Sequence, residues 1–220
     1  MANFLLVHGA WHGAWCWQRV LPGLVRAGHR AHAVTLTGVG ERAHLLHPGI
    51  DLETHILDVM AAMDAEEMSD VVLVVHSYAG MLGTAVADRR PERLSHLVYL
   101  DAVLPKPGES GSSTHASTTR NARIAAAQAH PQRAFPAPDP TVFGLSDADH
   151  AWVQRRQTPH PGGPYTQVLD FDPQRVASVP RTFINCIAPP LGTIDVSRLR
   201  MVDPKFWDGA WLPGSRVLEM

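Results

Sequence analysis

The residues best placed to do chemistry lie around Ser77, which closely follows an apolar, mostly β-branched run at 71–75. A run of small and apolar residues at 81–90 predicts a helix, so Ser77 should lie on a sharp turn between a buried strand and a helix. Such a nucleophile elbow lifts the hydroxyl above the sheet, and the next backbone N–H, at a helix N-terminus, can stabilise an oxyanion. Val75 and Ala79 stand where the usual motif has glycine. The alternative is a serine that only caps the helix.

Two other patterns that suggest chemistry are better explained as loops. His8 and His12 are four residues apart, but that spacing suits zinc on a helix with His-Glu-x-x-His, whereas glycines here predict a loop. The segment 38–43 superficially matches a dinucleotide fingerprint, yet Pro48 soon interrupts any helix. We therefore predict no metal and no cofactor.

The composition predicts one α/β domain with an insertion. The chain has 220 residues, of which 45% are hydrophobic, enough for a sizeable core. A formal net charge of −2 argues against binding to nucleic acid or to an acidic membrane surface. No apolar run approaches the roughly 20 residues that cross a bilayer, and the N-terminus has no signal-peptide pattern, so we expect a cytoplasmic protein. Cys16 and Cys186 suggest no disulfide framework.

Strand and helix patterns alternate in the first half, as a mostly parallel sheet covered on both faces requires. Strands are predicted at 4–7, 31–36, 71–75 and 97–100, and helices at 17–25, 52–63 and 81–90. Eleven of the 18 prolines then fall within 105–180, where periodicity is poor. We interpret 1–104 as the core domain, 105–180 as a lid insertion, and 181–220 as the core continued, with strands at 181–186 and 215–220.

Four segments together resemble one family: 4–17, 28–29, the elbow at 76–77, and 98–105. They are similar to the α/β-hydrolase branch that contains plant methylesterases, hydroxynitrile lyases and related bacterial esterases. The resemblance runs in order through these segments and weakly through 181–220, whereas the lid matches only in position and size. It implies an α/β-hydrolase fold, a mostly parallel sheet with helices on both faces and an inserted lid.

The resemblance also implies an oxyanion hole. In the family it consists of two backbone N–H groups, which correspond here to Ala10, after the first strand, and Tyr78, after the nucleophile. Both should lie at turns above the carboxyl edge of the sheet. His76 is expected to be structural, because neighbouring side chains at a strand end point to opposite faces and the family's esterases have a histidine there.

The triad acid has two candidates. In the plant members it follows the strand that corresponds to 181–186, but the matching position here is about Ala188, which cannot serve. Asp101 ends the strand beside the nucleophile strand, and Asp195 lies further along the loop after Cys186. We favour Asp101, and the alternative for Asp101 is a carboxylate that caps a turn.

The catalytic base is expected after the last strand, because the order in this fold is serine, acid, histidine. No histidine follows the strand predicted at 215–220, and the last histidine is His160, within the lid. The family's terminal helix is missing as well. Either the protein has lost its base or, as we expect, the natural chain continues past Met220 with a histidine and a helix.

Three functions remain open. The first is a serine esterase for a small carboxylic ester, with Ser77 as nucleophile. The second is a hydroxynitrile lyase, whose branch has a threonine at the position of Ala10 and a glutamate at that of His76, so both residues favour the esterases. The third is an inactive ligand-binding protein. Small-molecule substrates are the expected partners, with no nucleic acid and no membrane, and homo-oligomer formation is left open.

Overall fold

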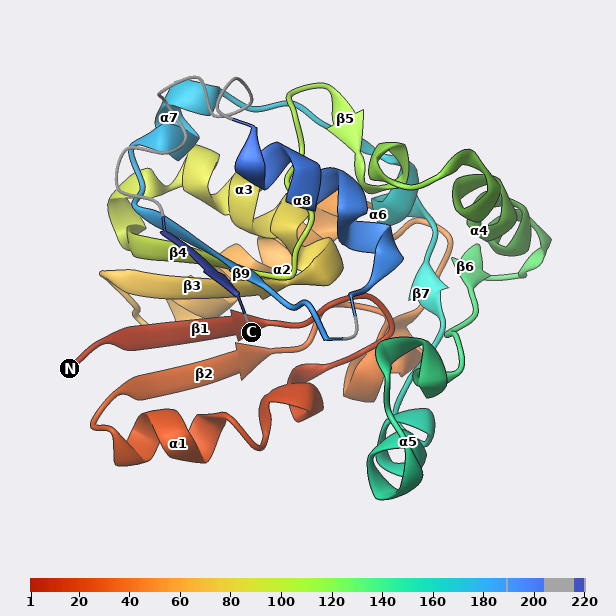
Figure 1. The fold of residues 1–220 in the computed structure, drawn as a ribbon, viewed down its shortest axis with the longest axis horizontal. Coiled ribbons are helices and arrows are strands. Elements are labelled where there is room, and N and C mark those ends of the chain that lie inside the picture. Colours follow the sequence, from red (N-terminus) through yellow and green to blue (C-terminus); the bar gives the residue numbers. More distant parts are fainter. Residues whose placement is uncertain (189, 204–215, 220) are drawn as a thin grey trace.

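Six strands form the central sheet of the computed structural model, which describes residues 1–188, 190–203 and, for their backbone, 216–219. All neighbouring strands are parallel. In spatial order they are β10 (Arg216–Glu219), β9 (Arg181–Asn185), β4 (Leu94–Leu100), β3 (Val71–His76), β1 (Asn3–Val7) and β2 (Arg30–Val34). Their carboxyl ends therefore meet at one edge of the sheet, which Figure 1 shows on the right.

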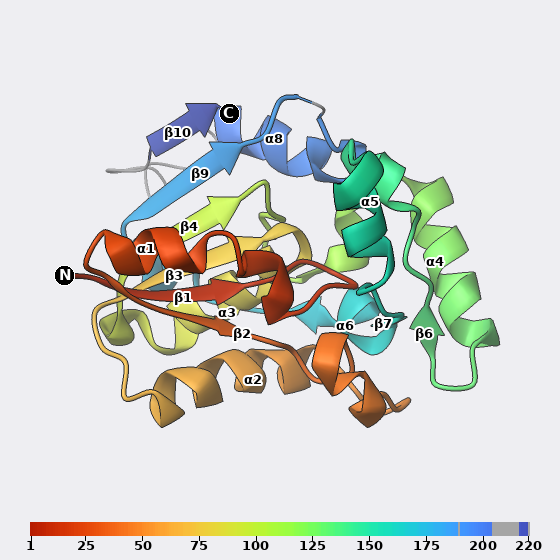
Figure 2. The ribbon, with the colours of Figure 1, turned by 90° about the horizontal axis from the view of Figure 1, so that it is seen from below.

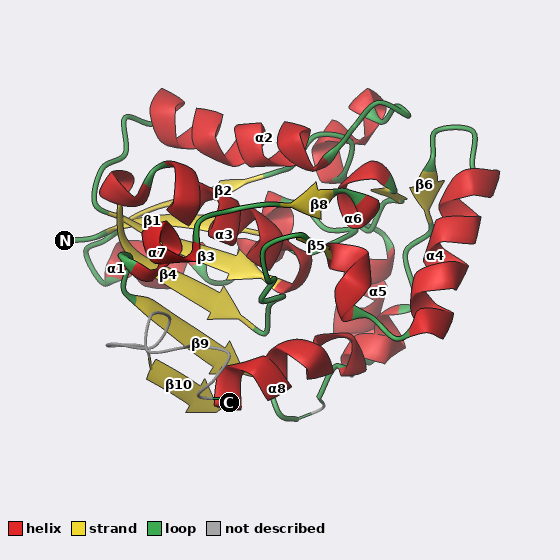
Figure 3. Cartoon of the chain, turned by 90° about the horizontal axis from the view of Figure 1, so that it is seen from above, coloured by secondary structure: helices red, strands yellow, loops and turns green. Residues whose placement is uncertain are grey.

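Helices cover both faces of this sheet (Figures 1 and 3). The short α1 (Leu21–Arg26) lies on one face, and α2 (Leu52–Ala65), α3 (Gly80–Arg89) and α8 (Asp195–Val202) lie on the other. Asp51 caps α2, because its carboxylate accepts the backbone N–H of Thr54 at 2.8 Å. This arrangement confirms the fold expected from the alternation of strands and helices.

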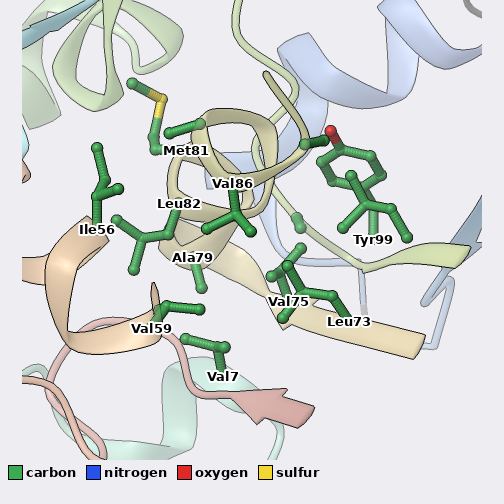
Figure 4. Close-up of a cluster of buried hydrophobic side chains, with 14 of the residues drawn as sticks. Val7, Ile56, Val59, Leu73, Val75, Ala79, Met81, Leu82, Val86 and Tyr99 are labelled. Carbon is green, nitrogen blue, oxygen red and sulfur yellow. The ribbon is translucent and has the colours of Figure 1, made fainter. Parts of the chain in front are cut away.

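The main core lies between the sheet and the pair α2 and α3 (Figure 4). A Cβ added at Gly83 of α3 would lie 2.8 Å from Val75 and 3.0 Å from Leu97. The close contact of helix and strand that the elbow needs is therefore made by a glycine on the helix. This explains how valine can stand at position 75.

The insertion lies beyond the carboxyl ends of the strands (Figures 1 and 2). It contains the helices α4 (Ser117–Ala129), α5 (Asp147–Gln154) and α6 (Gly163–Thr166), and two short antiparallel pairs. The pairs are β5 (Glu109–Ser110) with β8 (Val168–Leu169), and β6 (Ala134–Phe135) with β7 (His160–Pro161).

The last part of the 105–180 segment packs as core. Phe171, Val176 and Val179 are buried in the main cluster, and α7 (Pro173–Ala177) contacts α3. Asp195, expected in a loop, is the first residue of α8. The terminal helix and the histidine expected beyond the last strand lie outside the described residues.

Candidate functional site

Ser77 lies between β3 and α3 and lines a cavity of about 520 Å³ at the carboxyl edge of the sheet. Its φ of +53° is in the left-handed region, a strained conformation for serine that tightly packed surroundings must maintain. Its carbonyl accepts the N–H of Val103 at 2.9 Å, and Gly9 comes so close that an added Cβ would lie 3.0 Å from Ser77 Cβ. The strand-turn-helix geometry predicted for the elbow is present.

The two predicted oxyanion donors border the same cavity. Ala10 follows β1, and Tyr78 lies in the first turn of the 3₁₀ helix Ser77–Ala79, where N–H groups have no partner within the helix. In the part of the chain that the structure describes, the N–H of Ala10 makes no hydrogen bond. Ala10 and Tyr78 therefore both lie at the cavity, as an oxyanion hole requires, and their role as donors stays a prediction.

Two histidines, the buried His8 and the partly buried His12, hold the loop that carries Ala10. His8 Nε2 accepts the N–H of Leu36 at 3.1 Å, so His8 Nδ1 carries the hydrogen that it donates to Gly9 O at 2.7 Å. Burial lowers the pKa of His8 to about 3, so the ring is neutral at pH 7. His12 donates through Nδ1 to Ala10 O at 2.6 Å. The glycines predicted a loop in this segment, and these hydrogen bonds stabilise that loop.

Tyr78 is anchored in the same way. His55 Nε2 donates to Thr37 O at 2.9 Å, which leaves Nδ1 to accept the Tyr78 hydroxyl at 3.0 Å. Burial is the main cause that lowers the pKa of His55 to about 4. His55 was not singled out by the sequence, because nothing in its local pattern shows that it meets a residue 23 positions away.

His76 borders the cavity beside Ser77, and its ring lies edge-on to Trp17 with 6.5 Å between the ring centroids. A Cβ on Gly9 would lie 3.0 Å from both His76 Nδ1 and Ser77 Cβ. The positive φ of Ser77 turns the chain directly after β3, and the structural role expected for His76 stays a prediction. Burial lowers the pKa of His76 to about 4.

Asp101 lies at the cavity wall, just after β4, and is only 5% exposed. Its carboxylate accepts Arg198 Nη2 at 2.7 Å. Burial raises the pKa of Asp101, and the Arg198 charge opposes that rise. Asp195 pairs with the same arginine at 2.9 Å, but its side chain is 66% exposed and does not line the cavity.

Four histidines line this cavity: His12, His76, His115 and His160. Within the described ranges none of them is hydrogen-bonded to the Ser77 hydroxyl. His160 is buried in β7, accepts the N–H of Trp11 at 3.4 Å through Nδ1, and has its pKa lowered mainly by burial. His160 thus borders the cavity, and its ring is neutral at pH 7.

The 105–180 segment contributes Arg123, Phe135 and Tyr165 to the cavity wall, three residues that the sequence did not indicate. Trp11 meets Phe135 edge-on at 5.7 Å between ring centroids, and Phe135 lies 5.2 Å from Tyr165. Arg123 of α4 is beside all three rings. The poor periodicity of 105–180 gave no signal for these three residues, and the contacts of Arg123 and Phe135 with Trp11 join segments far apart in the chain.

The described residues hold no cluster of three or more His, Cys, Asp or Glu arranged for a metal ion. Among the same residues, no helix combines the length and apolar character needed to cross a membrane.

Comparison with known proteins agrees with this geometry. Residues 4–217 match the family described as "Alpha/beta hydrolase family". A carbendazim hydrolyzing esterase of Nocardioides sp. (strain SG-4G) is 56% identical over 110 residues, which cover 50% of this chain and 46% of that protein. Polyneuridine aldehyde esterase of Rauvolfia serpentina is 38% identical over 112 residues, 49% of this chain and 41% of that protein. The matches therefore span less than half of these relatives.

Solved structures share the whole fold. An extracellular alpha/beta-hydrolase from a Paenibacillus species has a TM-score of 0.80 at 20% identity, over 100% of this chain and 90% of that one. A methylesterase from Arabidopsis has a TM-score of 0.76 at 22% identity, and the match covers 100% of this chain and 89% of that one. At these identities the likeness extends to the fold alone.

Proposed function

Because the chain belongs to the alpha/beta hydrolase family, we propose that it is a serine esterase that hydrolyses a small carboxylic ester. The observation that carries this proposal is Ser77, held at a φ of +53° on the wall of a cavity that Ala10 and Tyr78 also line. A volume of about 520 Å³ is suitable for a small organic ligand. The relatives of 56% and 38% identity are both named as esterases.

In the proposed reaction, Ser77 Oγ attacks the ester carbonyl carbon while a base takes its proton. The N–H groups of Ala10 and Tyr78 stabilise the oxyanion of the tetrahedral intermediate. Collapse breaks the bond to the alcohol, which leaves with the proton, and an acyl group remains on Ser77. Water then attacks the acyl carbon by the same route and releases the acid.

We assign the acid of the triad to Asp101, because it borders the cavity and is buried, whereas Asp195 is exposed. Its role is to orient the imidazole of the base and stabilise the imidazolium. We propose a histidine as that base, and the order serine, acid, histidine points to one that follows the last strand.

The test is hydrolysis of 4-nitrophenyl acetate, with carbendazim as a second substrate because the relative of 56% identity is named for it. Ser77→Ala should lower turnover by up to about a millionfold. Ser69→Ala, an exposed serine before β3, is the matched control and should keep wild-type activity. Wild-type turnover in the Ser77 variant would refute the proposal.

A ligand-binding protein without turnover is the second candidate, favoured by the absence of a histidine hydrogen-bonded to Ser77 within the described residues. It predicts that the full-length wild-type protein hydrolyses no ester although small apolar ligands bind. Hydroxynitrile lyase activity would appear as cyanide released from mandelonitrile, and Ala10 and His76 argue against it.

A further inference from the structure

A half-buried arginine borders the cavity without an acidic partner. Arg123 of α4 lines the same cavity as Ser77. Its guanidinium carbon lies 5.0 Å from the ring centre of Trp11, 5.7 Å from that of Phe135 and 5.5 Å from that of Tyr165. Three aromatic rings therefore surround a permanent positive charge.

No carboxylate of the described residues forms an ion pair with Arg123. Among the described residues, Asp101 is the one acidic side chain that lines the cavity, and it is already paired with Arg198 at 2.7 Å. Burying a cation without a counter-ion is unfavourable. An arrangement that nevertheless keeps a guanidinium at a ligand cavity indicates that the missing negative charge comes with the ligand.

The neighbours of Arg123 leave most of its donors free for this role. His115 Nδ1 lies 3.0 Å from Gly111 O and carries the hydrogen, so His115 Nε2 accepts from Arg123 Nη1 at 3.3 Å. Burial, then the charge of Arg123, lowers the pKa of His115 to about 4, so His115 adds no second positive charge at pH 7. The Tyr165 hydroxyl also contacts Arg123. A guanidinium has five N–H groups, and these two contacts use only part of them.

We propose that Arg123 is a specificity-determining residue that binds a carboxylate on the substrate, so the preferred esters carry a negative charge besides the ester group. The aromatic walls suit a flat, apolar body between the two groups, and the planar guanidinium fork suits bidentate binding of a carboxylate. The assignment of this carboxylate to a substrate rests on the proposed ester hydrolysis, whereas the anion site itself does not.

Binding tests the site without any turnover. Calorimetry on the full-length protein should show benzoate binding about 10- to 100-fold more tightly than neutral benzamide, the range expected for a hydrogen bond to a charged group. Arg123→Met, which keeps much of the apolar stem, should remove that difference. Arg155→Met, an exposed lid arginine outside the cavity, should retain it. Equal affinities for benzoate and benzamide in the wild type would overturn the proposal.

Hydrolysis tests the substrate class. The ratio of kcat/KM for monomethyl terephthalate to that for methyl 4-methylbenzoate should exceed one and fall about 10- to 100-fold in Arg123→Met. An equal fall for both esters would mean that Arg123 only supports the aromatic rings, and would overturn the proposal. If no ester is hydrolysed but benzoate binding depends on Arg123, the proposed function fails and the anion site stands.

Should Arg123→Met melt far below the wild type, Arg123→Lys provides the second measurement. It retains the charge, so benzoate should still bind more tightly than benzamide, and added NaCl should weaken benzoate alone. Salt-insensitive benzoate binding in both wild type and Arg123→Lys would contradict an anion site.

Discussion

Gly80 tests the packing that holds the nucleophile in place. A Cβ at this position would lie 1.9 Å from Val103 O, 2.8 Å from its carbonyl carbon and 2.9 Å from its nitrogen, whereas real Cβ contacts stay beyond 3.0 Å. These are backbone atoms, which cannot rotate away, so the chain must move by roughly 1 Å. We expect Gly80→Ala to destabilise the fold by about 3 kcal/mol, the upper end of ordinary overpacking.

The same change should disturb the site, since the N–H of Val103 donates to Ser77 O at 2.9 Å. Displacing a catalytic group by about 1 Å can cost roughly 100-fold in rate. A loss of 3 kcal/mol corresponds to a fall in Tm of about 6–12 °C for a protein of this size. Thermal unfolding by circular dichroism and ester turnover measure the two effects on one sample.

Gly23→Ala is the matched control. Gly23 lies in α1, and a Cβ there would meet nothing within 4 Å. Replacing a helical glycine should stabilise the protein by about 0.5–1 kcal/mol. If Gly80→Ala melts within 2 °C of the wild type and keeps full activity, the tight packing of Gly80 against the Val103 backbone does not hold Ser77 in place, and the reasoning is refuted.

Three further predictions concern charged groups. Asp101→Asn should lower turnover about ten-thousandfold while Asp195→Asn leaves it nearly intact; the reverse ranking in 4-nitrophenyl acetate assays would move the acid to α8. Arg198→Met should cost about 3 kcal/mol in urea unfolding, because Asp101 stays buried without its partner, and an unchanged urea midpoint would contradict that pairing. Stability should also fall as the pH drops below about 6.5. Burial lowers the pKa of His8 to about 3 and that of His55 to about 4. Both histidines are therefore protonated more readily in the unfolded chain, and low pH favours unfolding. Urea midpoints at pH 8, 6 and 4.5 check this sign, and a midpoint that rises toward pH 4.5 would refute it.

The sequence predicts the parts of the site whose geometry is local. A β-branched run, a serine and a helix at 71–90 are enough to predict the elbow, and Asp101 is found because it ends a strand next to β3. The sequence does not explain why Val75 can replace the usual glycine of the elbow. The structure does, because Gly83 of α3 lies against Val75.

The lid residues could not be predicted because their contacts are non-local. Arg123 meets Trp11, which lies far away in sequence, and no periodic pattern in 105–180 indicates which side of α4 faces the cavity. The pairing of Asp101 with Arg198, 97 residues further on, is likewise invisible in the sequence.

Covalent labelling tests the central claim, that Ser77 is the nucleophile, most directly. The full-length protein is incubated with a fluorophosphonate, and its intact mass and digested peptides are measured beside those of Ser77→Ala. We predict one phosphonate per chain, located on Ser77, with ester turnover lost in proportion to labelling. Label on another serine, or ester hydrolysis that continues while Ser77 is unmodified or absent, would contradict the account.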